Sequence, residues 1–188
     1  MTEHEPWVGA EYNLGIGGQR VAIVGYSHWG EEAHDTPEAT RECVAQVISC
    51  EWRIRFFTQI RNYFGYDDHG AFWPRVLFFN FLPNLVGGPN RRFNHGTPEQ
   101  HAHGLSRFER LIHRHRPDRV FVFTGRHWAF GLNNERRALP NFPKFSSRTY
   151  KIGQHTAKAF FLRHPQGASK DLMRRAVMYV IEEPDSKD

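Results

Sequence analysis

His164 follows a short apolar run, Ala159–Arg163, and is itself followed by Pro165. Proline restricts the residue before it to extended backbone, which helps fix the direction of the imidazole. Three other apolar runs also lead into polar, aromatic or glycine residues, at Gly25, Asn80 and Thr124. Imidazole and amide groups donate and accept hydrogen bonds. We therefore interpret the four ends as parts of one candidate site.

The elements that must position these residues are four strands, predicted over Val21–Gly25, Val76–Phe81, Arg119–Thr124 and Ala159–Arg163. Their apolar residues are continuous rather than alternating, which is typical of strands covered on both faces in a parallel sheet. Because helical patterns lie between and after them, we expect a three-layer α/β/α sandwich with a central four-stranded, mostly parallel sheet. Ligands of such sheets bind outside the carboxyl ends of the strands.

Caps and apolar spacing predict four helices, over residues 36–50, 56–64, 97–116 and 169–181. Thr36 and Pro37 are typical of the first turn of a helix. Thr97 and Gln100 have the spacing of a capping box. Ser169 precedes a regular apolar stripe. These helices would cover the faces of the sheet.

The chain has 188 residues, enough for a real core, and we predict a single domain over residues 1–188 with an irregular N-terminal segment over residues 1–18. No apolar run approaches the roughly 20 residues that a membrane span needs. The N-terminus lacks the basic start and apolar region of a secretory signal. Cys43 and Cys50 are the only cysteines, too few for a disulfide framework, so we expect a cytoplasmic protein.

The charge balance is basic, with a formal charge of +5 and a pI of about 9.5. Arginine offers a planar fork that suits phosphates. Aromatic residues make up 14% of the chain, and many stand beside basic ones, an arrangement that fits nucleic-acid binding. The same composition also fits surface arginines over an aromatic core, so it leaves both readings open.

The four strand ends carry a resemblance in their order along the chain. The segments "VAIVGYSHWG", "VLFFNFLP", "RVFVFTGRHWAFGL" and "FFLRHPQGAS" follow one another. In this order they resemble the motifs of the uracil-DNA glycosylase superfamily over roughly residues 20–181. The resemblance implies a monofunctional enzyme that flips a base out of DNA and hydrolyses its N-glycosidic bond. It also implies a monomer that binds duplex or single-stranded DNA without a metal or other cofactor.

The resemblance assigns roles to individual residues. His164 would donate a hydrogen bond to a carbonyl oxygen of the departing base. Asn80 would read the edge of the flipped base, since an amide offers one acceptor and two donors. Gly25 would let the backbone approach the ligand closely. Trp29 stands near the family's aromatic residue beside the pyrimidine C5 position.

The first motif departs from the family pattern. Ser27 stands where the family has Asp, Asn or Glu to position water. Glu31 or Glu32 could supply the acid instead, or His28 could orient water. The family's stacking phenylalanine has no obvious counterpart after this motif, and Tyr26, Trp29 or Trp73 could substitute for it.

Four residues are candidates for phosphate contacts at the same edge, namely Arg126, Arg163, Ser169 and Lys170. The fourth motif also differs from the family, because Gln166 replaces the usual serine and the second proline is missing.

Two other classes of function remain open. A scaffold without the acid at Ser27 could bind nucleic acid or a nucleotide and cleave nothing. The twelve histidines invite a metal site, but the pairs His101/His103 and His113/His115 are two residues apart and diverge on a helix. We therefore expect no metal.

Overall fold

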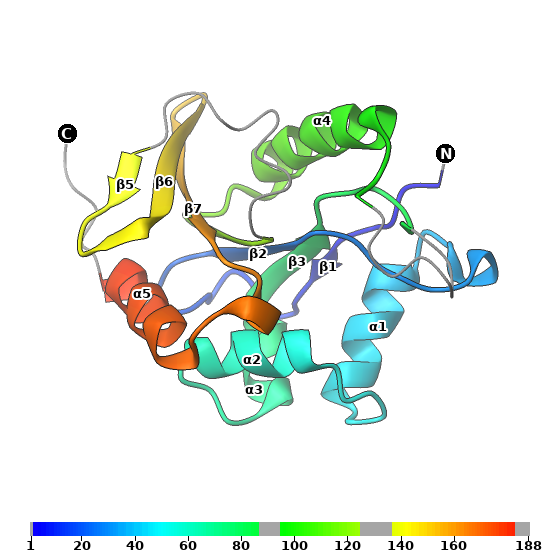
Figure 1. Cartoon of the computed structure of the whole chain (residues 1–188), viewed down its shortest axis with the longest axis horizontal. Coiled ribbons are helices and arrows are strands. Elements are labelled where there is room, and N and C mark those ends of the chain that lie inside the picture. The colour runs from blue at the N-terminus through cyan, green and yellow to red at the C-terminus, as the bar shows by residue number, and fades with distance from the viewer. Residues whose placement is uncertain (1, 87–94, 125–136, 183–188) are drawn as a thin grey trace.

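The structure, a computed structural model, describes residues 2–86, 95–124 and 137–182. Within these residues a seven-stranded mixed sheet runs through the molecule in the order β1-β3-β2-β4-β7-β6-β5 (Figure 1). The strands span Trp7–Val8 (β1), Val21–Gly25 (β2), Val76–Asn80 (β3), Arg119–Phe123 (β4), Arg137–Leu139 (β5), Phe142–Ile152 (β6) and His155–Leu162 (β7). The chain is thus an α/β protein, as predicted.

The four predicted strands form the centre of this sheet and are mutually parallel, from β3 through β2 and β4 to β7. All residues of β2, β3 and β4 are buried, which explains why their sequences are continuously apolar. The parallel core is therefore confirmed.

The prediction of only four strands was wrong. β6, which forms a long hairpin with β7, and the short strand β5 extend the sheet on one side by antiparallel pairing. On the other side β1 pairs antiparallel with β3, so residues 1–18 are not wholly irregular. The sequence analysis did not predict these strands, because β6 is mostly polar along its length and β1 has only two residues.

The helices are α1 (Ala39–Ile48), α2 (Arg55–Tyr63), α3 (His69–Phe72), α4 (Pro98–His115) and α5 (Lys170–Glu182), with short 3-10 turns η1 (Glu32–His34), η2 (Trp73–Arg75) and η4 (Pro165–Gly167). The predicted capping box is present, because Gln100 N–H donates to Thr97 Oγ1 at 3.1 Å and Thr97 N–H to Gln100 Oε1 at 2.8 Å. The cap predicted at Thr36 is wrong: α1 begins at Ala39, three residues later.

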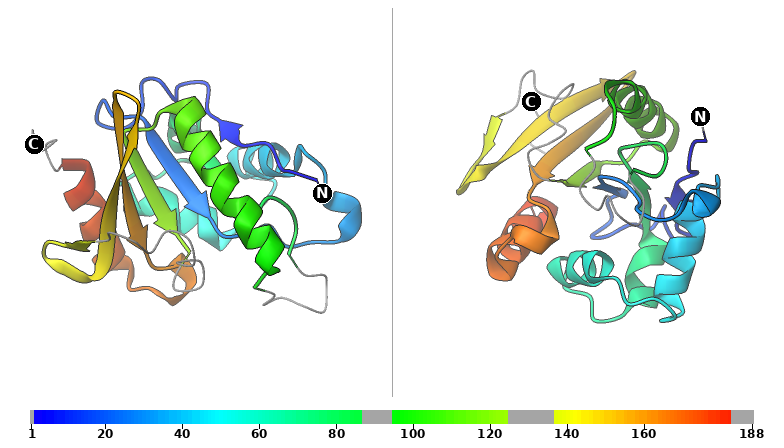
Figure 2. Two further views of the ribbon diagram at one scale, coloured as in Figure 1. Left: turned by 90° about the horizontal axis from the view of Figure 1, so that it is seen from above. Right: turned by 45° about the vertical axis from the view of Figure 1, so that its right-hand side comes forward.

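Helices cover both faces of the sheet (Figure 2). On one face α4 packs through Phe108, Leu111 and Ile112 against the even-numbered residues of β2 and β4 and the odd-numbered ones of β3. On the other face α1, α2, α3 and α5 pack against the alternate strand residues. This second face contains the candidate site.

Candidate functional site

Strand register brings two of the predicted site residues together. Gly25 at the end of β2 is paired with Asn80 at the end of β3. A Cβ atom on Gly25 would lie 2.2 Å from Oδ1 of Asn80, which is closer than atoms can approach. The position therefore requires glycine as long as the buried Asn80 amide keeps its place.

Phe56 links this pair to His164. Its ring tip would lie 3.4 Å from the same Cβ position, and its ring centroid is 5.5 Å from that of His164 at an interplanar angle of 33°. Phe56 is half-buried in the first turn of α2. Phe56 thus lies against both the Gly25–Asn80 pair and His164 at the carboxyl edge of the sheet.

The hydrogen bonding of His164 defines its ring. His164 precedes η4, and Gln166 N–H donates to its Nδ1 at 3.2 Å. Nδ1 is then an acceptor, so the proton of the neutral ring is on Nε2. Burial lowers the pKa of His164. The ring is accordingly neutral at pH 7 and offers one N–H donor at Nε2.

The backbone of Asn80 is held by Arg107 of α4, a residue that the sequence reading did not single out. The Arg107 guanidinium is 1% exposed and donates to the carbonyl oxygens of Asn80 and His4. Its Nε also lies 3.3 Å from Oε1 of Glu3. Although burial lowers the pKa of Arg107 to about 10, the group remains charged at pH 7. It ties the N-terminal segment to the end of β3.

The first motif is divided between the two faces of the sheet. The Tyr26 hydroxyl donates to the His95 carbonyl oxygen and lies 3.2 Å from Nε2 of His101, so Tyr26 packs on the α4 face, away from Phe56. Ser27 is half-buried, and Trp29 is 45% exposed. The contacts of His164 described above are with Phe56 and Gln166.

Glu31 and Glu32 are exposed around the start of η1. Within the described residues no carboxylate forms a hydrogen bond or an ion pair with His164. The acid expected from this turn therefore makes no hydrogen bond or ion pair with the imidazole in the described residues.

Two other suggestions from the sequence do not fit the geometry. His28 is in a hydrogen bond of 2.9 Å with Thr40 Oγ1, and burial lowers its pKa to about 3. It is an internal ring rather than a water-orienting group. Trp73 is fully buried, donates to His69 Nδ1 at 3.0 Å, and precedes β3 at the opposite end of the strand from Asn80. It cannot be the stacking ring.

Three of the four residues predicted to contact phosphate lie within the described part of the chain. Arg163, Ser169 and Lys170 are exposed beside η4 and the start of α5. The Ser169 hydroxyl accepts a long hydrogen bond of 3.5 Å from Leu172 N–H, which is a weak form of the predicted cap. Arg126 lies outside the described residues.

In the part of the chain that the structure describes, little supports a metal site, a reactive thiol or a membrane-spanning helix. No group of three His, Cys, Asp or Glu side chains there could hold a metal ion. Burial raises the pKa of Cys43 to about 12, so this thiol is a poor nucleophile. None of the described helices is long and apolar enough to cross a membrane.

Comparison of the chain with protein families and with curated proteins finds no match.

Proposed function

We propose that this protein binds DNA and hydrolyses the N-glycosidic bond of a flipped deaminated or damaged base, on a three-layer scaffold of the uracil-DNA glycosylase type. The single observation that carries the proposal is that Phe56 lies against both the Gly25–Asn80 pair and His164. Asn80 and His164 are 84 residues apart in the chain. The order and residue types of Gly25, Asn80 and His164 match the resemblance described above.

Each group has a task in such a reaction. The Phe56 ring, which the sequence did not identify, provides a stacking surface for a base. The Asn80 amide can pair with the base edge, and glycine at position 25 leaves room for that amide. His164 donates its Nε2 proton in a hydrogen bond to the base carbonyl oxygen, where negative charge develops as the bond breaks. A neutral donor suffices for this role.

The departure at Ser27 favours a second candidate function. No carboxylate contacts His164 in the described residues, and Glu31 is exposed in solvent. Without a group that positions water or balances the oxocarbenium charge, hydrolysis would be slow. The protein could then bind a damaged base or a nucleotide without cleaving it.

The test is a set of labelled oligonucleotides that carry uracil, hypoxanthine, xanthine or a thymine mispair, in duplex and single-stranded form. They are incubated with the protein and treated with alkali, which cleaves the strand wherever a base has been removed. Strand cleavage with one lesion supports the glycosylase. Tight binding of a lesion without cleavage supports the second candidate, and neither result with any oligonucleotide would contradict both.

A further inference from the structure

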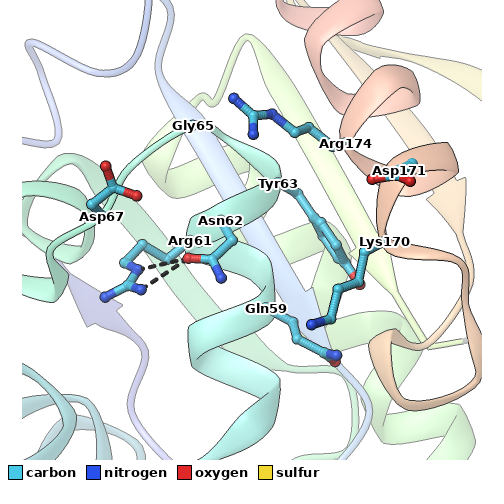
Figure 3. Close-up of a pocket in the computed structure, with 9 residues that line it drawn as sticks. All are labelled: Gln59, Arg61, Asn62, Tyr63, Gly65, Asp67, Lys170, Asp171 and Arg174. Atoms are coloured by element: carbon cyan, nitrogen blue, oxygen red, sulfur yellow. Dashed lines mark hydrogen bonds between the residues drawn. The ribbon is translucent and has the colours of Figure 1, made fainter.

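A separate cleft lies between α2 and α5, beside the turn that carries His164 (Figure 3). Its volume is about 470 Å³, and its lining is mainly polar. The lining residues that matter here are Gln59, Arg61, Tyr63, Lys170, Asp171 and Arg174. None of Gly25, Phe56, Asn80 and His164 belongs to this lining.

The cleft has an excess of positive charge. Lys170 and Arg174 are four residues apart on α5, so they share one face of that helix. Arg61 enters from α2, where its guanidinium donates to Asn62 Oδ1 at 2.9 and 3.2 Å. Two carboxylates, of Asp67 and Asp171, also border the cleft. Three cations against two anions leave one net positive charge.

The floor of the cleft contains a polar group without a partner. Tyr63 is 2% exposed, and its hydroxyl has no hydrogen-bond partner among the described residues. In Figure 3 the phenol extends from α2 toward α5, with its hydroxyl on the side of Lys170. A buried hydroxyl without a partner costs about 1–3 kcal/mol. Burial raises the pKa of Tyr63, so the hydroxyl stays protonated and can donate.

Gln59 connects the cleft to the turn that follows His164. With its amide oriented so that both ends are satisfied, its nitrogen donates to the Pro165 carbonyl oxygen at 3.1 Å and its oxygen accepts from Arg55 Nε at 3.2 Å. Pro165 is the residue directly after His164. A polymer that places one unit beside His164 can therefore reach the cleft with a neighbouring unit.

We propose that the cleft between α2 and α5 is a phosphate subsite, in which Lys170, Arg174 and the Tyr63 hydroxyl bind a phosphodiester of the strand whose base enters the pocket at His164. Two cations and one neutral donor suit a singly charged, tetrahedral anion with several acceptor oxygens. The choice of a DNA strand as the source of the phosphate rests on the proposed function; the anion site itself does not.

The experiment measures binding of two probes that contain no base to excise. One is a fluorescent single-stranded oligonucleotide made only of abasic-analogue units, and the other is inorganic pyrophosphate. Affinity for the oligonucleotide is measured by anisotropy at several salt concentrations. The double variant K170Q/R174Q should lose at least about tenfold in affinity and reduce the salt slope by about 1–2.

Matched variants distinguish binding in the cleft from a general effect of positive charge on the surface. Arg175 is exposed on the same helix but does not line the cleft, so R175Q should change affinity less than twofold. Tyr63→Phe should weaken binding several-fold without lowering the melting temperature, because the lost hydroxyl has no partner in the free protein. Asp171→Asn should strengthen binding, since it removes a negative charge from the cleft.

Three results would overturn the subsite. These are equal losses in R175Q and K170Q/R174Q, unchanged binding in Tyr63→Phe, and binding of pyrophosphate but not of the oligonucleotide, which would make the ligand a free phosphate. Loss of oligonucleotide binding in the cleft variants supports the subsite even if no lesion is ever excised. Its failure is thus distinguishable from failure of the glycosylase assignment.

Discussion

At the scale of single residues, the state of His164 decides what the site can do. The backbone N–H of Gln166 donates a hydrogen bond to Nδ1 at 3.2 Å, and burial lowers the pKa of the ring. Both effects favour a neutral imidazole with its proton on Nε2. This form is suited to donate a hydrogen bond to a leaving base but carries no positive charge of its own.

Replacing His164 by alanine should abolish most of the excision activity. Loss of a donor aimed at developing negative charge costs about 10²–10³ in rate, and single-turnover cleavage of the best lesion in the oligonucleotide set would measure it. His113→Ala, at an exposed position on α4, is the control. Equal rates for H164A and the unchanged protein would remove His164 from the mechanism.

Replacing Ser27 by aspartate should raise uracil excision. The change restores an acidic residue at the position where the resemblance places one, and a carboxylate can position water and stabilise the oxocarbenium ion. The comparison is the single-turnover rate of S27D against those of the unchanged protein and of S27N, a residue that the family also uses there, so a gain in S27D alone assigns the effect to the negative charge. If S27D brings no gain, the base pocket must use another acid or take another ligand.

At the scale of elements, the site depends on how β2 pairs with β3 and how α2 lies across their ends. The pairing sets Gly25 beside Asn80, and α2 brings Phe56 close to Gly25. From the opposite face of the sheet, Arg107 of α4 donates a hydrogen bond to the carbonyl oxygen of Asn80. The asparagine is therefore held by contacts from two different elements, β2 and α4.

A double-mutant cycle tests this arrangement. Gly25→Ala should displace the Asn80 amide, because the new Cβ would lie 2.2 Å from Oδ1, and should weaken lesion binding about as much as Asn80→Ala. In the Asn80→Ala background the clash is absent, so adding Gly25→Ala should change lesion affinity little and leave stability equal or higher. Binding is measured by anisotropy and stability by urea unfolding. Additive losses in affinity would contradict the contact.

At the scale of the whole molecule, several buried or half-buried histidines couple stability to pH. Burial lowers the pKa of His4, His69, His115 and His164, and brings that of His28 to about 3. The rings of His4, in the N-terminal segment, and His28 lie 5.4 Å apart between centroids. The fold therefore stabilises the neutral form of these rings.

The free energy of unfolding should fall as pH drops below about 6.5, the ordinary histidine pKa. In that range the unfolded chain binds more protons than the folded one, so the contribution that is complete above pH 6.5 is lost progressively toward pH 3. Urea unfolding at pH 7.5, 6, 5 and 4 measures the slope. His28→Gln, which retains a hydrogen-bonding group opposite Thr40, should flatten it, and an identical slope in this variant would contradict the role of His28.

The sequence by itself determined the four parallel strands, the capping box of α4 and the residue types at the strand ends. Continuous apolar runs can be recognised in a sequence because burial on both faces of a strand excludes polar residues. A capping box can be recognised because it has characteristic residue types at a fixed spacing. Asn80, Gly25 and His164 could be predicted as site residues for the same reason, because each ends or directly follows such a run.

Only the tertiary structure decided that Phe56 completes the site and that Arg107 holds Asn80. In sequence Phe56 is one more apolar residue of a helical stripe, and Arg107 is one more arginine of a basic helix. Likewise the polar pattern of β6 does not reveal a strand, because its partner, β7, supplies the hydrogen bonds. Which residues meet depends on pairing and packing between distant segments, and no local pattern encodes those contacts.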